Sequence, residues 1–225
     1  MYLSRLILNP RSRRVQSELA SPYELHRTLM QGFPQTDGKD PREEFDVLFR
    51  VDICPRTNRI AVLVQSAAKP DWTLHARIPG YLVETGGAPP HPDGKSIDRQ
   101  TEALRVGQTL AFRLHANPAK RSVKGDNKGK RVGLYREEEQ VAWLRRKAEA
   151  CGFDLLQAAV APEGLKIGRK RGPAPDESHR TKHHAVRFEG VLRIVDADRF
   201  RAALKQGIGP GKAFGFGLLS LAPPG

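Results

Sequence analysis

The order of strand and helix patterns constrains the fold of this chain more than any other feature. The first half carries strand, helix, strand, strand, helix and strand patterns over residues 2–8, 22–30, 45–51, 59–66, 98–105 and 108–116. Ser21 and Pro22 are typical of a helix start, and the turn over residues 55–58 indicates a hairpin. This βαββαβ order predicts a ferredoxin-like domain over residues 1–117.

The second half repeats the order of elements without repeating the sequence. Its patterns lie over residues 131–135, 137–150, 153–160, 184–195, 196–206 and 213–221. The helix over 137–150 is the clearest, because apolar residues recur there at three- and four-residue spacing. We therefore predict an α+β fold of two tandem ferredoxin-like (RRM-like) βαββαβ domains, the second over residues 118–225. Residues 11–18, 118–131 and the polar segment after 171 are expected to be loops or a linker.

The charge balance predicts a polyanionic partner. Lys and Arg number 38 against 25 Asp and Glu, which gives a net charge of +13 and a pI near 10.1. Nucleic acid is the obvious polyanion. The chain begins with a strand pattern and has no long apolar run, so we expect a cytoplasmic protein without a membrane partner. Cys54 and Cys151 lack the spacing of a zinc site or disulfide framework, and we expect no metal and no cofactor.

The helix predicted over residues 22–30 carries residues that could cleave RNA. Tyr23 and His26 are three residues apart and share one helix face, and Arg27 follows His26. In RNA the 2′-OH can attack the adjacent phosphate, so a protein needs only to move protons and offset charge. Histidine titrates near neutrality and suits either proton transfer, tyrosine can orient or donate a proton, and arginine can stabilise the phosphate. A lone histidine on a short helix is more often a surface or capping residue, so this pattern alone does not establish catalysis.

Two further segments are candidates for binding phosphate. The glycine-rich segment 206–217 fails both the Walker and the GxGxxG patterns, because Gln206, Lys212 and Ala213 occupy key positions. It could still bring backbone close to phosphate, although a tight turn explains its glycines equally well. The second segment is a cluster of Lys and Arg around residues 166–171 and at 182, which could hold an RNA stem, although a run of charge is more often a solvated loop. The candidate substrate-binding residues are Arg27, Lys166, Arg169, Lys170, Arg171, Lys182, Gly207, Gly209, Gly211, Lys212, Gly215 and Gly217.

Together these motifs resemble one family, the CasE endoribonucleases that process CRISPR RNA in the type I-E Cascade complex. The resemblance covers nearly the whole chain. It is carried by Met1-Tyr-Leu-Ser-Arg5, Tyr23-Glu-Leu-His26, Val62-Leu-Val-Gln-Ser66, Phe112-Arg-Leu-His-Ala-Asn-Pro118, Ala142-Trp-Leu144, Phe188-Glu-Gly190 and Gly207–Gly217. Each motif is weak alone, and their common order makes the match specific.

The resemblance implies a substrate, partners and site residues. It implies metal-independent cleavage at the 3′ base of a CRISPR repeat RNA hairpin by 2′-OH attack, with the product retained among other Cascade subunits. It assigns the catalytic role to His26 and Tyr23 and the grip on the stem to basic residues around Arg169–Arg171. His115 departs from the pattern, since the resemblance suggests arginine there. A non-catalytic hairpin-binding subunit and a structural backbone subunit are the alternatives, and the Tyr23/His26 pair disfavours both.

Overall fold

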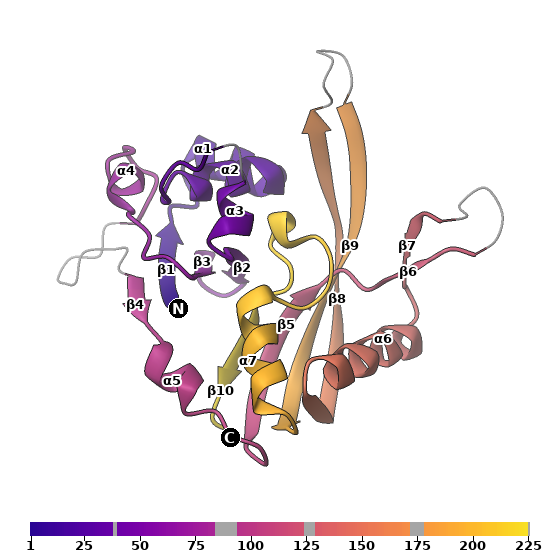
Figure 1. The fold of residues 1–225 in the computed structure, drawn as a ribbon. Coiled ribbons are helices and arrows are strands. Elements are labelled where there is room, and N and C mark those ends of the chain that lie inside the picture. The colour runs from indigo at the N-terminus through magenta and orange to yellow at the C-terminus, as the bar shows by residue number, and fades with distance from the viewer. Residues whose placement is uncertain (38–39, 84–93, 124–128, 172–177, 225) are drawn as a thin grey trace. The chain divides into compact units, whose positions relative to one another are not determined.

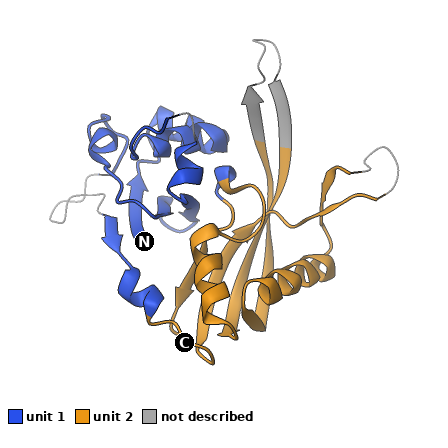
Figure 2. Ribbon diagram, viewed as in Figure 1, with its two compact units in different colours: residues 1–102, 168–180, 213–215 blue, residues 103–167, 181–212, 216–225 orange. Residues whose placement is uncertain are grey.

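The computed structural model describes residues 1–37, 40–83, 94–123, 129–171 and 178–224 of the 225-residue chain (Figure 1). The chain divides into two compact units (Figure 2). Unit 1 comprises Met1–Glu102, Gly168–Arg180 and Ala213–Gly215, and unit 2 comprises Ala103–Ile167, Thr181–Lys212 and Phe216–Gly225.

Unit 1 is built on an antiparallel sheet with the strand order β2-β3-β1-β4. Its elements are β1 (Tyr2–Leu8), α1 (Arg13–Ala20), α2 (Pro22–Met30), α3 (Pro41–Glu44), β2 (Leu48–Cys54), β3 (Arg59–Ser66), α4 (Thr73–Ala76), β4 (Gly94–Ser96) and α5 (Asp98–Glu102). This is the ferredoxin-like order, with the first and third strands in the middle of the sheet. Leu25 and Leu29 of α2 pack with Leu6, Leu8 and Phe49 in one core, because apolar residues alternate along the strands and recur along the helix.

Unit 2 has the same arrangement, with the strand order β10-β5-β9-β8. Its elements are β5 (Thr109–Ala116), β6 (Ala119–Arg121), β7 (Arg131–Gly133), α6 (Glu137–Ala150), β8 (Phe153–Arg171), β9 (Ser178–Ile194), α7 (Ala197–Gln206), a 3-10 turn (Lys212–Phe214) and β10 (Leu219–Ala222). Side chains of α6 and α7, such as Trp143 and Phe200, pack with Phe112 and Phe188 of the sheet in one core. The prediction of two ferredoxin-like domains is confirmed.

The strand expected to complete the first sheet belongs to the second. Residues 109–116 pair with β9 and β10, so β5 is the first strand of the second βαββαβ set. The first sheet is completed instead by β4, a polar three-residue strand that pairs with the start of β1. The compact units accordingly change between Glu102 and Ala103, rather than at residue 117.

Two predicted loops contain regular structure, and two predicted strands have different bounds. Part of residues 11–18 lies in α1, where Val15 is buried and Arg14 pairs with Glu18 one turn later. The expected linker over 118–131 includes β6 and the start of β7, which form a two-stranded ribbon. The strand predicted over 153–160 continues to Arg171 in β8, so the charged residues 165–171 are strand. The strand predicted over 213–221 begins only at Leu219, because glycines with positive φ precede it.

Candidate active site

Helix α2 has the bounds that the sequence predicts, and it places His26 at its buried face. Pro22 occupies the first turn with Glu24, and Ser21 stands at the N-cap position although its side chain makes no cap hydrogen bond. Leu25, His26, Thr28 and Leu29 are buried, whereas Arg27 is exposed and pairs with Glu24 at 3.0 Å. The helix therefore directs His26 inward and Arg27 toward solvent.

His26 lies near two aromatic rings and is only 5% exposed. Its ring centroid is 6.2 Å from that of Tyr23, at 43°, and 6.2 Å from that of Phe49, in a stacked arrangement at 16°. Nδ1 is buried without a hydrogen-bond partner among the described residues. Burial lowers the pKa of His26, the charge of Asp40 opposes this, and the charge of Arg42 adds to it. The imidazole is thus predominantly neutral at pH 7, a form that can accept a proton.

The buried carboxylate of Glu18 holds α2 in place close to His26. Thr28 donates its hydroxyl hydrogen to Glu18 Oε1 at 2.7 Å, and Tyr81 donates to Glu18 Oε2 at 2.5 Å. Arg14 donates from Nε to the same carboxylate at 2.9 Å, which compensates the buried charge. Burial, together with the hydrogen bond to Glu18, raises the pKa of the Tyr81 hydroxyl, so it remains a donor.

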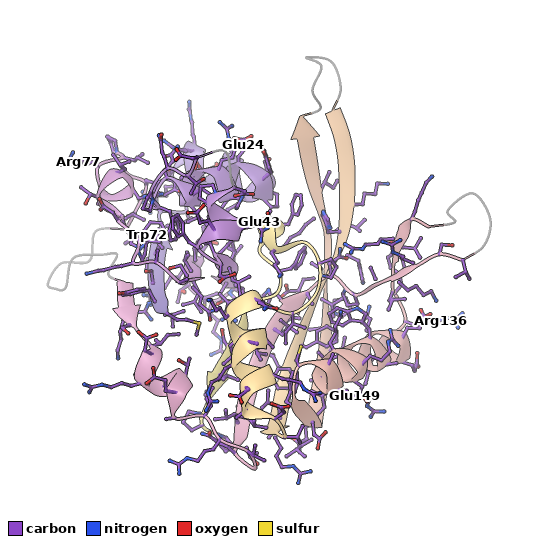
Figure 3. The ribbon with its side chains drawn as sticks, viewed as in Figure 1. Glu24, Glu43, Trp72, Arg77, Arg136 and Glu149 are labelled. Carbon is purple, nitrogen blue, oxygen red and sulfur yellow. The ribbon has the colours of Figure 1, made fainter. Side chains whose placement is uncertain are left out.

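A second hydrogen-bond contact holds the backbone of Thr28. His75 is fully buried, and its Nε2 lies 2.8 Å from the carbonyl oxygen of Thr28. Trp72, labelled in Figure 3, meets the His75 ring edge-on with centroids 4.9 Å apart. The helix that carries His26 is therefore held by both the side chain and the backbone of one residue, two positions further on.

Gly215 of the glycine-rich segment belongs to unit 1 and packs closely against Phe49 there. A Cβ at Gly215 would lie 3.1 Å from Cε2 of Phe49, the ring that stacks on His26, and Gly215 has a φ of 80°. Gly207, Gly209, Gly211 and Gly217 also have positive φ. In unit 2, a Cβ at Gly209 would lie 2.9 Å from the Trp143 ring. These glycines are required by the backbone conformation and the packing, whatever ligand the segment binds.

The predicted basic residues lie in different surroundings. Lys166 is half-buried, with Nζ 4.7 Å from the centroid of the Phe216 ring, so part of its charge is engaged within unit 2. Lys182 is exposed on β9, and Lys212 lies in the 3-10 turn. Arg169, Lys170 and Arg171 end strand β8, and their side chains fall outside the described residues.

The sequence did not single out several neighbours of His26 or the partners of His115. Phe49 stacks on His26, and the charges of Asp40 and Arg42 act on its pKa. These residues are distant from His26 along the chain, so no local pattern indicated them. His115 is buried, with Nδ1 3.1 Å from Glu163 Oε2, and Arg187 Nε lies 3.4 Å from the other carboxylate oxygen. Burial alone would raise the pKa of Glu163, but His115, Lys166 and Arg187 hold it below its ordinary value. His115 thus belongs to a charged network on the sheet of unit 2.

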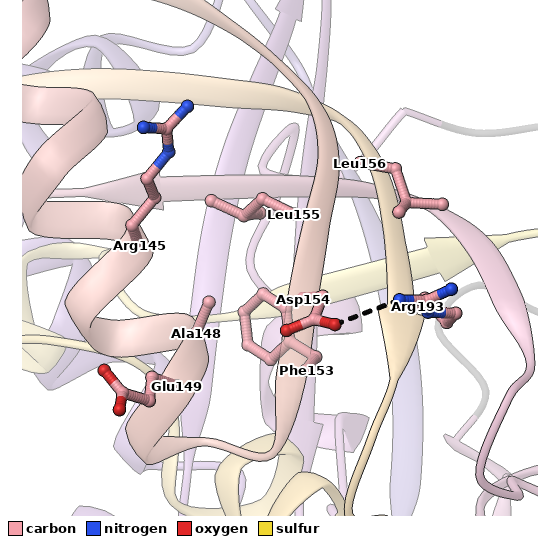
Figure 4. A pocket seen from close by; sticks show the side chains of 8 residues that line it. All are labelled: Arg145, Ala148, Glu149, Phe153, Asp154, Leu155, Leu156 and Arg193. Carbon is pink, nitrogen blue, oxygen red and sulfur yellow. Dashed lines mark hydrogen bonds and ion pairs between the residues drawn. The ribbon is translucent and has the colours of Figure 1, made fainter.

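A separate pocket between α6 and the strands of unit 2 contains none of the predicted site residues. It is lined by Phe153, Leu155 and Leu156 (Figure 4). Arg193 and Asp154 also line it and form an ion pair at 3.2 Å. Among the described residues, no group of three or more His, Cys, Asp or Glu side chains is arranged to hold a metal ion.

The fold and these residues define a class: a basic, double ferredoxin-like protein with a candidate acid–base helix. A family model described as "CRISPR associated protein" matches residues 1–223. The chain is 40% identical to the "CRISPR-associated endoribonuclease Cse3" of Thermus thermophilus and 36% identical to the "CRISPR system Cascade subunit CasE" of Escherichia coli, in each case over 99% of this chain and 100% of the relative. It also matches the structure of Thermus thermophilus Cse3 bound to an RNA representing a pre-cleavage complex, with a TM-score of 0.75 and 38% identity over 99% of this chain and 98% of that one. The chain belongs to this CRISPR-associated protein family, as the sequence motifs predicted.

In the part of the chain that the structure describes, no helix combines the length and apolar character needed to cross a membrane.

Proposed function

We propose that this chain is the endoribonuclease that cuts CRISPR precursor RNA at the 3′ base of each repeat hairpin. The observation that carries the proposal is the full-length match to Cse3, an endoribonuclease, combined with the Tyr23/His26 pair on α2. The net charge of +13 supports binding of an RNA stem. The full-length match to CasE, a Cascade subunit, supports assembly of this chain with other Cascade subunits, where it keeps its product.

The proposed reaction is attack of a 2′-OH on the adjacent phosphate. His26 accepts the 2′-OH proton, since burial favours its neutral form. The bond from phosphorus to the 5′-oxygen breaks as the bond to the 2′-oxygen forms, and the leaving 5′-oxygen takes a proton from water to become a hydroxyl. Tyr23, on the same helix face, orients the reacting groups, and Arg27 and the glycine-rich segment 207–217 bind phosphate. Arg169–Arg171, Lys166 and Lys182 hold the stem. The products are a 2′,3′-cyclic phosphate and a 5′-hydroxyl, and no metal or cofactor takes part.

We place this reaction in the cytoplasm. Precursor RNA is available there, and the two cysteines of the chain are free thiols.

The proposal is tested by cleavage of a labelled repeat hairpin in EDTA, beside the same RNA with one 2′-deoxy at the expected cut. Cutting of the all-ribose RNA alone is expected. Tight binding without cutting would instead make the chain a hairpin-binding subunit. Cutting of the deoxy RNA would contradict the 2′-OH mechanism.

A further inference from the structure

The two-stranded ribbon of β6 and β7 is an insertion in the ferredoxin-like order of unit 2. It lies between β5 and α6, where the first βαββαβ set has no strands, and it pairs with neither four-stranded sheet. Figure 1 shows it projecting from unit 2 near the start of α6. An isolated two-stranded ribbon is only marginally stable in water, so a charged one benefits from a partner.

The ribbon has two different faces, because residues directly opposite each other in an antiparallel pair point to the same side. Lys120 lies opposite Val132, and Lys120 Nζ pairs with Glu139 of α6 at 2.8 Å. Arg121 lies opposite Arg131 on the other face, and both are exposed. Neither arginine forms an ion pair with any described residue. Like charges directly opposite each other repel, so this face favours an anion.

The face that carries Arg121 and Arg131 extends to the rings of Tyr135 and His184. Gly133 is two residues from Arg131 and lies on the same face. The position that a Cβ would take at Gly133 is 3.6 Å from the hydroxyl of Tyr135 and 3.5 Å from Cβ of His184. The Tyr135 and His184 rings lie 4.7 Å apart at 44°, and Tyr135 is 65% exposed. One side of the tyrosine is thus backed by protein, while the other is open to solvent.

His184 is held in place by two neighbouring amides. Its backbone N–H donates to Asn117 Oδ1 at 3.1 Å, and Gln140 Nε2 lies 3.3 Å from its Nε2. Burial lowers its pKa. Lys182, two residues earlier on β9, faces the same side, and Arg136 lies at the start of α6 after Tyr135 (Figure 3). An ordered ring pair is therefore flanked by exposed cations.

His183 lies on the opposite side of β9. Its ring centroid is 6.1 Å from that of Phe216, and its Nδ1 is 3.7 Å from the position of a Cβ at Gly211. The ring pair is therefore on the other side of β9 from the glycine-rich segment.

We propose that Arg121, Arg131, Tyr135 and His184 form a second RNA-binding surface, which takes the unpaired RNA strand that continues from the hairpin. The arginines bind its phosphates, and an unstacked base lies on the open side of Tyr135. Stacking on an exposed ring requires a base that is free of a duplex, which distinguishes single-stranded RNA from the stem. The inference rests on the proposed function, because it concerns the same substrate.

The test compares the chain's own CRISPR repeat hairpin with and without its single-stranded extensions, each carrying a 2′-deoxy at the cut. Arg121→Ala/Arg131→Ala should weaken binding of the extended RNA and lower the slope of log K against log salt by about 1.4, for two phosphates at about 0.7 each on a single strand. Binding of the bare hairpin should stay the same. Arg145→Ala/Arg146→Ala, which removes two exposed cations from α6, is the charge-matched control and should lower the slope for neither RNA.

Substitutions of Tyr135 test whether an RNA base stacks on its ring. Tyr135→Ala should weaken binding of the extended RNA by about fivefold or more, the effect of losing one stacked base, whereas Tyr135→Phe should bind like the wild type. Thermal melts identify any variant that has lost its fold.

The outcomes separate this inference from the proposed function. Equal losses for bare and extended RNA would assign the ribbon to the stem and overturn the inference. Unchanged RNA affinity with weaker incorporation into Cascade would identify a protein partner and also overturn it. If the wild-type chain neither bound nor cut the bare hairpin, the proposed function would fail and the inference with it.

Discussion

Unit 1 and unit 2 arrange their strands in the same order, with the first and third strands of each set in the middle of the sheet. Their corresponding first-crossover helices bury different groups. Helix α2 buries His26 and Thr28 beside its leucines, whereas α6 buries Trp143, Leu144, Ala148 and the amide of Gln140. A titratable group beside an aromatic ring is thus a property of one helix rather than of the fold.

The strands also differ, because two strands of the second βαββαβ set are much longer than those of unit 1. In unit 1, β1, β2 and β3 have seven or eight residues, whereas β8 and β9 have 19 and 17. The second βαββαβ set also carries the basic ribbon. The proposed function implies a division of labour, in which α2 performs the chemistry and the extended strands of the second set bind the substrate. Each prediction below affects one side of this division.

The largest effect is expected from removing the buried imidazole. His26→Ala should slow single-turnover cleavage by about a hundredfold or more, the usual contribution of general acid–base catalysis, while a 2′-deoxy hairpin binds as before. Tyr23→Phe should have a smaller effect, because it keeps the ring beside His26. Equal losses of binding and cleavage in His26→Ala would make His26 a structural residue and end this division of labour.

The next effect concerns the end of β8. Replacing Arg169, Lys170 and Arg171 together with alanine should weaken hairpin binding by about tenfold or more at low salt and reduce its salt dependence. Saturating RNA should restore most of the cleavage rate, since the helix with His26 is untouched. Arg145→Ala/Arg146→Ala is again the control. An unchanged salt slope would move the stem-binding site elsewhere.

The pH dependence sharpens the role of His26. Burial holds its pKa below 6.5, so a base role predicts that kcat/KM is constant near neutrality and falls only as the pH drops below that value, by about tenfold per unit once His26 is protonated. Tyr23→Phe should keep this acid limb. A rate that fell with rising pH through the same region would make His26 the general acid.

The comparison also shows how much a sequence can reveal. The bounds of α2 and α6 agree with the prediction because each has regular apolar spacing, with a proline start in α2 and three glutamates in the first turn of α6. The pattern of β5 predicted a strand correctly but not its sheet, since alternation does not specify the neighbouring strand. Helix α1 was hidden by its charges, of which Arg14 and Glu18 turn out to pair.

The candidate site was predictable only along one helix. Tyr23 and His26 could be paired because they are three residues apart. Phe49 stacks on His26 from another element, and Tyr81 reaches Glu18 across 63 positions of sequence. Such contacts follow from the packing of unit 1, and no local pattern encodes them. The glycines of segment 206–217 were recognised, but the contact of Gly215 with Phe49 required the structure.

The smallest effect is expected at Thr28, which tests how α2 is held. Thr28→Val keeps the shape but removes the hydroxyl that donates to Glu18, so the buried carboxylate loses one donor. We expect a loss of about 1–3 kcal/mol in the free energy of unfolding and a decrease of a few fold in the single-turnover cleavage rate at unchanged RNA affinity, because His26 shifts while the stem-binding residues remain. Thr28→Ser, which retains the donor, should recover the cleavage rate. A destabilised Thr28→Val with the wild-type cleavage rate would restrict the Thr28–Glu18 hydrogen bond to stability, and the placement of His26 would then depend on the contact of His75 with the Thr28 carbonyl and on the packing of Leu25 and Leu29.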